Sequence, residues 1–389
     1  MRASPVLHMD AKQARGPFGK TQRLCVMADP RLKLYQFLMW KRHHIRTTVN
    51  REEHELRYLF FEVSRRCNIH CRYCGSGCTL DEREGELSTQ AWIDIIDQLA
   101  EDYDPARIMV AVTGGEPLFR EGIYEIFAHL HKRGFPYGMV TNSTLLNEAA
   151  AEKLVQCGID SISLSIDSIP EINDSIRGKG TSACVVRAIK NLREAGYTGI
   201  LEALSTITKP CMDHLEDMQN WVTELGLTRW RVSPVMPIGR ALENKDLLLD
   251  DADIEKLLLF VRRQRRLDKG ELRLEFSEEG YLGDRFEGLV RPYLCQCRAG
   301  INVGGIRYDG KIGACPEISQ SFDQGDIRTE RFSKVWNERF QVYRDRSWAR
   351  KLGPCRQCDK FHICHGGAMH LYDNTETPTH RCFYKMIEK

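Results

Sequence analysis

Three cysteines stand close together in the run CNIHCRYC, which covers residues 67–74. Cys67, Cys71 and Cys74 are separated by three and then two residues, so one short loop supplies three thiolates. A cubane 4Fe-4S cluster normally takes four cysteine ligands, and three ligands leave one iron with an open coordination position. A metal with an open position can bind and activate a small molecule, as a catalytic zinc does. The alternatives are a zinc knuckle or a chance grouping of cysteines.

The same run, including the aromatic Tyr73 directly before the last cysteine, resembles the signature of the radical SAM superfamily. The resemblance implies that Cys67, Cys71 and Cys74 hold a catalytic 4Fe-4S cluster and that Tyr73 belongs to the cofactor site. In such enzymes the open iron chelates the amino and carboxylate groups of S-adenosylmethionine (SAM). An electron from the cluster then cleaves a C–S bond of SAM and yields a 5′-deoxyadenosyl radical.

The composition is that of an ordinary globular enzyme. A chain of 389 residues exceeds what one compact core usually holds, which predicts a large domain and a smaller one. The net charge of +2 argues against a dedicated nucleic-acid-binding protein. No apolar segment reaches the roughly 18 residues of a membrane span, and the N-terminus lacks the apolar stretch of a secretory signal. Fifteen cysteines in such a chain indicate metal ligands before disulfides, which predicts a cytoplasmic protein.

Residues 1–55 form a basic N-terminal extension, with ten lysines and arginines against two acidic residues in the first 50. This charge is typical of a solvated arm, and the alternative is a docking surface for an acidic partner. Leu34, Phe37 and Leu38 recur at helical spacing, which predicts a short amphipathic helix that caps the main domain.

Residues 56–245 alternate short apolar runs with helical patterns, as in a β-α repeat. One helix is indicated by apolar residues from Trp92 to Leu99, with Ser88 or Thr89 as its cap. Six repeats imply a parallel sheet, and the family resemblance implies an α/β fold in which the sheet closes only partly into a (β/α)6 TIM barrel. The Cys67–Cys74 loop follows the first strand and is therefore expected at the mouth of the barrel. The predicted strands are 59–64, 107–113, 137–142, 160–166, 200–207 and 229–235.

The second predicted strand ends in Gly114, Gly115, Glu116 and Pro117, and this tetrapeptide resembles the family's GGEP motif. The resemblance implies that its backbone lies against the amino group of SAM, an approach that side chains at Gly114 and Gly115 would obstruct. Alone, the tetrapeptide could be an ordinary turn between a strand and a helix.

Three further residues are implied as SAM contacts by the same resemblance. Asn142 ends the third predicted strand, and Ser165 near the end of the fourth is expected to bond the ribose. Arg177 is expected to pair with the SAM carboxylate, because its planar fork binds a carboxylate through two bonds. The alternatives are a capping serine and a surface arginine. Relatives usually have glycine where Ser143 and Ser168 stand.

Beyond a helical linker at 246–290, residues 291–389 form a region rich in cysteine. Its spacing resembles the SPASM domain, an extension of radical SAM enzymes that carries auxiliary 4Fe-4S clusters. The resemblance implies one cluster held by Cys355, Cys358, Cys364 and Cys382. It implies a second cluster at Cys297 and Cys315, with Cys295 as a further ligand. A structural zinc is the alternative for four such cysteines.

Two positions depart from the family pattern. Ala368 stands where SPASM domains have the fourth ligand of the cluster nearer the barrel. That cluster could keep an open iron, could take His365 or His370 as its ligand, or could be absent. Pro316 stands where sulfatase-maturing members have a catalytic aspartate, which disfavours sulfatase maturation.

The sequence therefore predicts a radical SAM enzyme with a SPASM domain that abstracts hydrogen from a substrate at the barrel mouth. The favoured substrate is a ribosomally made peptide, and the alternative is a small molecule such as a tetrapyrrole, sugar or cofactor precursor. A further alternative is a non-catalytic iron-sulfur sensor or binding protein. The expected partners are the substrate and a reductant such as flavodoxin or ferredoxin, with neither nucleic acid nor membrane.

Overall fold

The computed structural model describes residues 30–81, 84–292 and 296–388. Residues 1–29 of the basic extension and the predicted ligand Cys295 lie outside these ranges. Among the described helices, none is both long enough and apolar enough to span a lipid bilayer.

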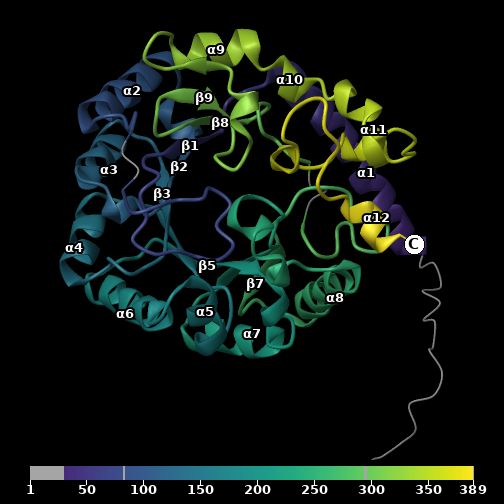
Figure 1. Cartoon of the computed structure of the whole chain (residues 1–389), viewed down its shortest axis with the longest axis horizontal. Helices are drawn as coiled ribbons and strands as arrows, with labels where there is room; N and C mark the ends of the chain where they lie inside the picture. The colour runs from purple at the N-terminus through teal and green to yellow at the C-terminus, as the bar shows by residue number, and fades with distance from the viewer. Residues whose placement is uncertain (1–29, 82–83, 293–295, 389) are drawn as a thin grey trace, which may run out of the picture.

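A parallel sheet forms the centre of the molecule, and its neighbouring strands pair in sequence order from β1 to β6. Each strand lies within a few residues of its predicted position, so the six predicted strands are confirmed. Figure 1 shows these strands inside a ring of helices, which is the arrangement of a partial barrel. The strands are Tyr58–Glu62 (β1), Met109–Thr113 (β2), Tyr137–Thr141 (β3), Ser161–Ser165 (β4), Ile200–Ile207 (β5) and Arg229–Pro234 (β6).

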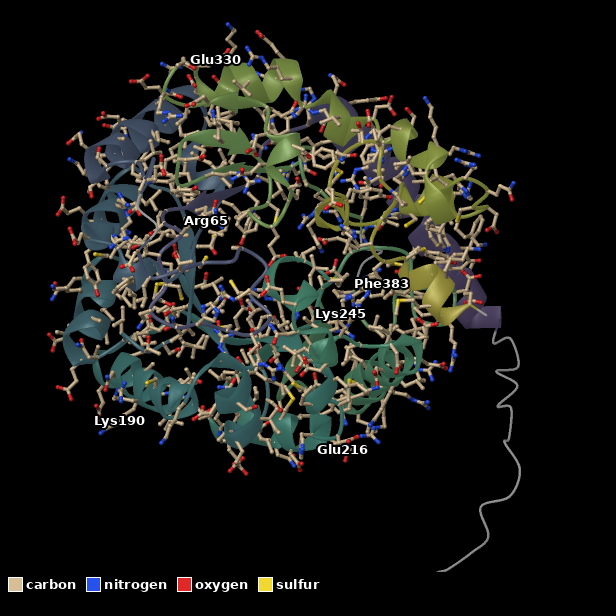
Figure 2. All side chains as sticks on the ribbon, in the orientation of Figure 1. Arg65, Lys190, Glu216, Lys245, Glu330 and Phe383 are labelled. Atoms are coloured by element: carbon tan, nitrogen blue, oxygen red, sulfur yellow. The ribbon has the colours of Figure 1, made fainter. Side chains whose placement is uncertain are left out.

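The helices between the strands bury one apolar face against the sheet. In helix α2 this face is Trp92, Ile95, Ile96 and Leu99, and the Ser88 hydroxyl caps the first turn by accepting the Ala91 N–H. The predicted helix and one of its two candidate caps are thus confirmed. Figure 2 shows charged side chains such as Lys190 and Glu216 pointing outward from the ring. The helices are Thr89–Asp102 (α2), Ile123–Lys132 (α3), Glu148–Gln156 (α4), Pro170–Arg177 (α5), Thr181–Glu194 (α6), Leu215–Glu224 (α7) and Asp251–Leu267 (α8).

The sheet continues past the six predicted strands in both directions. Strand β7, Arg273–Phe276, pairs with β6 in parallel and lies in the range predicted as a helical linker. Strand β8, Val303–Ile306, pairs in parallel with β1, and β9 (Lys311–Gly313) and β10 (Gly325–Asp326) follow as antiparallel neighbours. The first part of the cysteine-rich region therefore shares one ten-stranded sheet with the barrel. The predicted domain boundaries themselves stay a prediction.

The N-terminal helix α1, Pro30–Glu53, lies beside the C-terminal segments in Figure 1. Trp40 packs on Tyr281 with ring centroids 5.7 Å apart, and the Thr47 hydroxyl donates to Gln296 at 2.7 Å. The predicted helix is present, but the apolar residues that were expected to pack on the main domain lie on its exposed side. Leu34, Phe37 and Leu38 are each more than half exposed. Trp40 and Thr47 instead make the contacts with the C-terminal segments.

Short helices complete the C-terminal region and the loops. The α-helices are Phe332–Arg339 (α9), Gln341–Arg344 (α10), Phe361–Cys364 (α11) and Phe383–Ile387 (α12). The described 3-10 helices are Pro105–Arg107, Pro117–Phe119, Lys209–Cys211, Gly239–Leu242, Lys245–Leu247, Gln320–Phe322, Ser347–Lys351, Gly353–Cys355 and Met369–Leu371.

Candidate active site

A cavity of about 400 Å³ runs along the barrel interior to the carboxyl ends of the strands. Alternate residues of β2 and β4 face it, as Ser161, Ser163 and Ser165 do in β4, because successive side chains of a strand point to opposite faces. The cavity brings together most of the predicted site residues: Cys67, Cys71, Tyr73, Cys74, Gly114, Gly115, Asn142, Ser165 and Arg177.

The three-cysteine loop is held over this cavity by backbone contacts. The Cys67 N–H donates to the Thr79 carbonyl at 2.7 Å. From the turn after β6, Arg240 donates through Nε to the Cys71 carbonyl at 2.8 Å and through its backbone N–H to the Cys74 carbonyl at 3.0 Å. The ligand loop is therefore fixed by the last strand of the predicted six as well as by its own turns.

The thiols of this loop differ in their tendency to ionise. Burial raises the pKa of Cys67 to about 11 and also raises that of Cys71. The neighbouring Cys78 thiol donates to Cys74 and lowers the pKa of Cys74 to about 5. Cysteine binds metals as the thiolate, so two of the three sites need the charge of a bound metal to ionise near neutral pH. Three free thiols around one cavity, one buried and two half-buried, fit the predicted cluster, and Cys78 is a fourth thiol beside it.

The glycines after β2 are required by a close approach of two backbones. The Gly115 N–H donates to the Ser64 carbonyl at 2.8 Å, and the Glu116 N–H donates to the Arg66 carbonyl at 2.9 Å. A Cβ at Gly114 would overlap the Ser64 carbonyl oxygen, and one at Gly115 would overlap that of Arg66. The backbone of the segment that leads into Cys67 therefore leaves no room for a side chain at Gly114 or Gly115. The contact of these glycines with SAM stays a prediction.

Glu116 points away from the cavity and joins two strand ends. Its carboxylate, fully buried, accepts the Asn142 N–H at 2.7 Å, the Thr141 hydroxyl at 2.8 Å and the Leu118 N–H at 3.2 Å. Burial raises its pKa to about 6. Pro117 is also buried and begins a 3-10 helix. The side chains of these two residues lie outside the set that lines the cavity, so they position the site from behind.

We expect Gly115→Ala to lower the iron content at the three-cysteine loop and to destabilise the fold by about 1–3 kcal/mol. The reason is that the added Cβ meets the backbone of Arg66, which cannot rotate away. Iron analysis and chemical denaturation measure the two effects. Gly75→Ala is the matched control, since its Cβ would meet side chains and no backbone, the nearest being the flexible Ile238 side chain at 3.2 Å. Equal iron loss in both variants would contradict the explanation.

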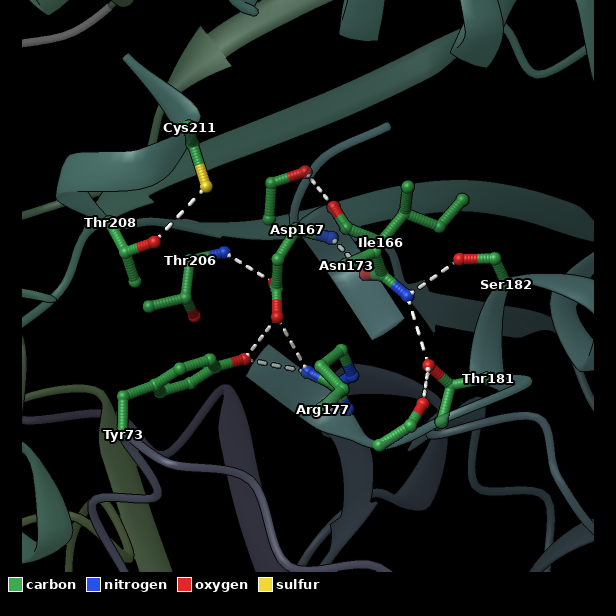
Figure 3. Close-up of polar contacts among 12 residues, drawn as sticks. Tyr73, Ile166, Asp167, Asn173, Arg177, Thr181, Ser182, Thr206, Thr208 and Cys211 are labelled. Atoms are coloured by element: carbon green, nitrogen blue, oxygen red, sulfur yellow. Dashed lines mark hydrogen bonds and ion pairs between the residues drawn. The ribbon is translucent and has the colours of Figure 1, made fainter. Parts of the chain in front are cut away.

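Arg177 lies at the cavity wall in a buried polar cluster (Figure 3). Its Nη1 lies 2.9 Å from Asp167 Oδ2 and donates to the Tyr73 hydroxyl at 2.6 Å. The Tyr73 hydroxyl donates to the same Asp167 oxygen at 2.5 Å, and the other Asp167 oxygen accepts the Thr206 N–H at 2.8 Å. Arg177 Nε has no hydrogen-bond partner among the described residues. A buried guanidinium with an unused donor fits the predicted carboxylate partner, and the surface alternative for Arg177 is wrong.

Two functional contacts were missed from the sequence. Asp167 was not predicted as a site residue, although it follows β4 by two positions on the same side as Ser165. A second, half-buried pair crosses the barrel interior, where Arg231 Nε donates to Glu202 Oε2 at 3.0 Å and the Ser163 hydroxyl donates to Glu202 Oε1 at 2.5 Å. A glutamate inside an otherwise apolar strand is the signal that could have indicated this pair.

Asn142 completes the wall beside the cysteine loop. Its amide nitrogen lies 3.7 Å from the Cys67 sulfur and donates to Asn68 Oδ1 at 3.0 Å. Ser143, the next residue, has a left-handed backbone with a φ of 68°. This conformation explains why glycine suits the position in relatives, because glycine adopts a positive φ without strain.

The predicted auxiliary cysteines separate into two places. Cys355, Cys358, Cys364 and Cys382 line one small cavity, where burial raises the pKa of Cys364 to about 12. Four thiols around one space fit the predicted auxiliary cluster. Cys315, in contrast, lines the barrel cavity together with Pro316 and Glu317.

The barrel-side auxiliary position has a different donor set. Ala368 is fully buried and lines the four-cysteine cavity, and of the three cysteines predicted for the barrel-side position only Cys297 and Cys315 are described. The two histidines considered as substitutes point to different surroundings. The pKa of His365 is lowered to about 3, mainly by burial and to a smaller extent by the nearby charges of Arg51 and Arg346. His370 Nε2 lies 3.5 Å from Glu278 Oε1. The described residues do not provide the four thiolates of a second auxiliary cluster.

The fold and the two cysteine sites define an iron-sulfur enzyme of the α/β class. The family model of the radical SAM superfamily matches residues 61–222, and that of an iron-sulfur cluster-binding domain, SPASM, matches residues 297–359. The mycofactocin maturase MftC of Mycolicibacterium smegmatis is 30% identical over 80% of this chain and 77% of its own length. This chain belongs to the radical SAM superfamily.

Two further relatives cover similar shares of the chain. The PqqA peptide cyclase of Granulibacter bethesdensis is 28% identical over 79% of this chain and 81% of its own. The AdoMet-dependent heme synthase of Oleidesulfovibrio alaskensis is 26% identical over 80% of this chain and 82% of its own. The enzyme class, its iron-sulfur clusters and its use of SAM are therefore confirmed.

Solved structures confirm the fold. The structure of anSMEcpe with bound AdoMet and Kp18Cys peptide superposes with a TM-score of 0.67 at 18% identity, covering 86% of this chain and 94% of that one. Streptococcus suis SuiB bound to its precursor peptide SuiA superposes with a TM-score of 0.64 at 18% identity, covering 89% and 80%.

Proposed function

We propose that this enzyme modifies a ribosomally made peptide by abstracting hydrogen from one of its residues. The observation that carries the proposal is the cavity of about 400 Å³ that runs from the three-cysteine loop to Cys315 and Glu317. Its volume is that of a site for one small ligand, and SAM must share it. A substrate that inserts one side chain and keeps its main chain outside suits the space that remains.

The relatives support the same substrate class. Two of them are named for peptide cyclisation or maturation, and the SuiB structure contains a precursor peptide. The heme synthases favour the second candidate, a tetrapyrrole substrate. The Glu202–Arg231 pair in the cavity wall offers charged contacts to either kind of substrate.

The roles of this chain's residues follow from their positions. When bound, the cluster supplies the electron that cleaves SAM and so provides the radical that takes the hydrogen. Arg177, held by Asp167 and Tyr73, orients the carboxylate of SAM. The barrel wall excludes water from the reacting groups. Cys355, Cys358, Cys364 and Cys382 would hold an auxiliary cluster, which would supply an acceptor for one electron.

The reductant and the compartment belong to the same proposal. A flavodoxin or ferredoxin would supply the electron, since a flavin or an iron-sulfur cluster transfers one electron at a time. The described cysteines are all free thiols, which supports a reducing cytoplasm.

The test compares two substrates with the reconstituted enzyme, SAM and dithionite. We expect a synthetic peptide, taken from a short reading frame beside this gene, to change mass and to increase 5′-deoxyadenosine formation. An enzyme lacking Cys67, Cys71 and Cys74 is the control. The proposal fails if such peptides stay unchanged while an iron-bound tetrapyrrole is converted.

A further inference from the structure

Glu278, Glu279 and His370 form a cluster between the barrel and the C-terminal region; Glu278 and His370 are buried, and the half-buried Glu279 lies at the edge of the four-cysteine cavity. One possible ligand atom of each residue lies within 4.8 Å of the other two. Glu278 is 5% exposed and His370 is 8% exposed. Glu278 and Glu279 follow β7, whereas His370 lies in the 3-10 helix Met369–Leu371, so the cluster joins the barrel sheet to the C-terminal region.

One buried polar atom of the cluster, His370 Nε2, lacks a hydrogen-bond partner among the described residues. It points toward Glu278 Oε1 at 3.5 Å. Glu278 Oε1 accepts the Glu279 N–H at 3.0 Å. Buried carboxylates and imidazoles are costly unless they are paired or bind a metal.

Arg291 and Arg381 both interact electrostatically with the Glu278 carboxylate, but these interactions offset only part of the cost of burying it. Arg291 pairs with Glu287 and donates to the backbone carbonyls of Glu278 and Gly280. Arg381 donates to the backbone carbonyls of Val235 and Leu249. Burial, followed by the charge of Glu279, raises the pKa of Glu278 well above its ordinary value. A bound cation would remove this conflict.

The cluster lies beside the barrel-side auxiliary position. His370 is two residues after Ala368, which replaces the fourth thiolate. Glu279 and Glu317 both act electrostatically on Cys315, whose pKa is raised mainly by burial. Two carboxylates and one imidazole are ligands for a single divalent ion and do not match the all-thiolate set of a 4Fe-4S cluster.

We propose that Glu278, Glu279 and His370 bind one divalent first-row metal ion, with zinc as the ion that best suits them. Zinc accepts mixed carboxylate and imidazole ligands at low coordination number. The ion fastens the segment after β7 to the 3-10 helix at Met369–Leu371, where an auxiliary cluster would otherwise join these parts. The proposal does not depend on the substrate of the enzyme.

The test adds zinc chloride to protein whose clusters have first been reconstituted, so that the cluster thiolates are occupied. After dialysis in metal-free buffer, we expect elemental analysis to find about one zinc per chain. His370→Gln and Glu279→Gln should each weaken zinc binding at least tenfold, since each removes a ligand. His380→Gln is the matched control, because that exposed imidazole contacts Asp373 at 2.9 Å and is not one of the three proposed ligands, so its loss should leave zinc binding unchanged.

Three outcomes would overturn the proposal. Zinc could be retained in the Glu279→Gln/His370→Gln double variant, or it could be lost only when Cys297 and Cys315 are changed to serine. A third full cluster, seen as about four additional irons and a further EPR signal in wild-type protein, would also overturn it. Circular dichroism identifies a variant that does not fold, and the half-buried Glu279→Gln then decides alone.

Discussion

Protein in which Cys67, Cys71 and Cys74 are all replaced by alanine is expected to lose about four irons per chain and all reductive cleavage of SAM. All three thiols lie in one loop at the barrel mouth and face the cavity. Without them no iron with an open position remains to hold SAM. Iron analysis after anaerobic reconstitution and chromatography of 5′-deoxyadenosine with dithionite measure the two losses.

The auxiliary site provides the internal comparison for this variant. Iron at Cys355, Cys358, Cys364 and Cys382 should remain, because those thiols line a separate cavity. Cys184→Ala is the control, since its half-buried thiol lies on α6 and contacts Arg187 at 3.2 Å. Residual 5′-deoxyadenosine in the triple variant would contradict the assignment of the loop.

Arg177→Ala is expected to weaken SAM binding by at least tenfold and to lower the free energy of unfolding by about 3–5 kcal/mol. The second effect arises because Asp167, which is 1% exposed, would keep a buried charge without its partner. Equilibrium dialysis of SAM and chemical denaturation measure the two quantities. The iron content should stay the same, because Arg177 is not an iron ligand.

A double variant separates the two roles of Arg177. In Arg177→Ala/Asp167→Asn the buried charge is removed, so most of the lost stability should return. SAM binding should stay weak, because no guanidinium faces the carboxylate of SAM. If SAM binding returns together with stability, Arg177 serves only to balance Asp167.

The strands and the ligand cysteines could be predicted because both leave local patterns. Short apolar runs gave the six parallel strands, and the spacing of Cys67, Cys71 and Cys74 gave the open iron site. The glycine motif after β2 was also recognisable, although the structure shows that its glycines meet the Ser64–Arg66 backbone. Local patterns therefore located the site, but they did not explain why particular residues occupy it.

Contacts between distant segments could not be predicted in the same way. Asp167 and Arg177 meet because α5 turns back over β4, and no spacing rule gives that distance. The spacing of Leu34, Phe37 and Leu38 predicted an amphipathic helix but did not show which of its sides packs against the rest of the protein. Glu278 and His370 come together only once β7 and the 3-10 helix at Met369–Leu371 are placed. Strand β8, with two glycines among four residues, has too weak a pattern to be recognised alone.

Because β1 pairs with β8, one edge of β1 must also wait for its partner strand while the chain is being synthesised. Tyr58 is opposite Val303, so this edge of β1 has no partner until roughly 240 further residues have been synthesised. At about 5–20 residues per second, the edge stays open for roughly 10–50 s. During that interval an aromatic-rich strand, YLFFE, exposes unpaired backbone groups that can pair with another nascent chain. The yield of native enzyme should therefore depend on the speed of translation and on chaperones that cover this edge.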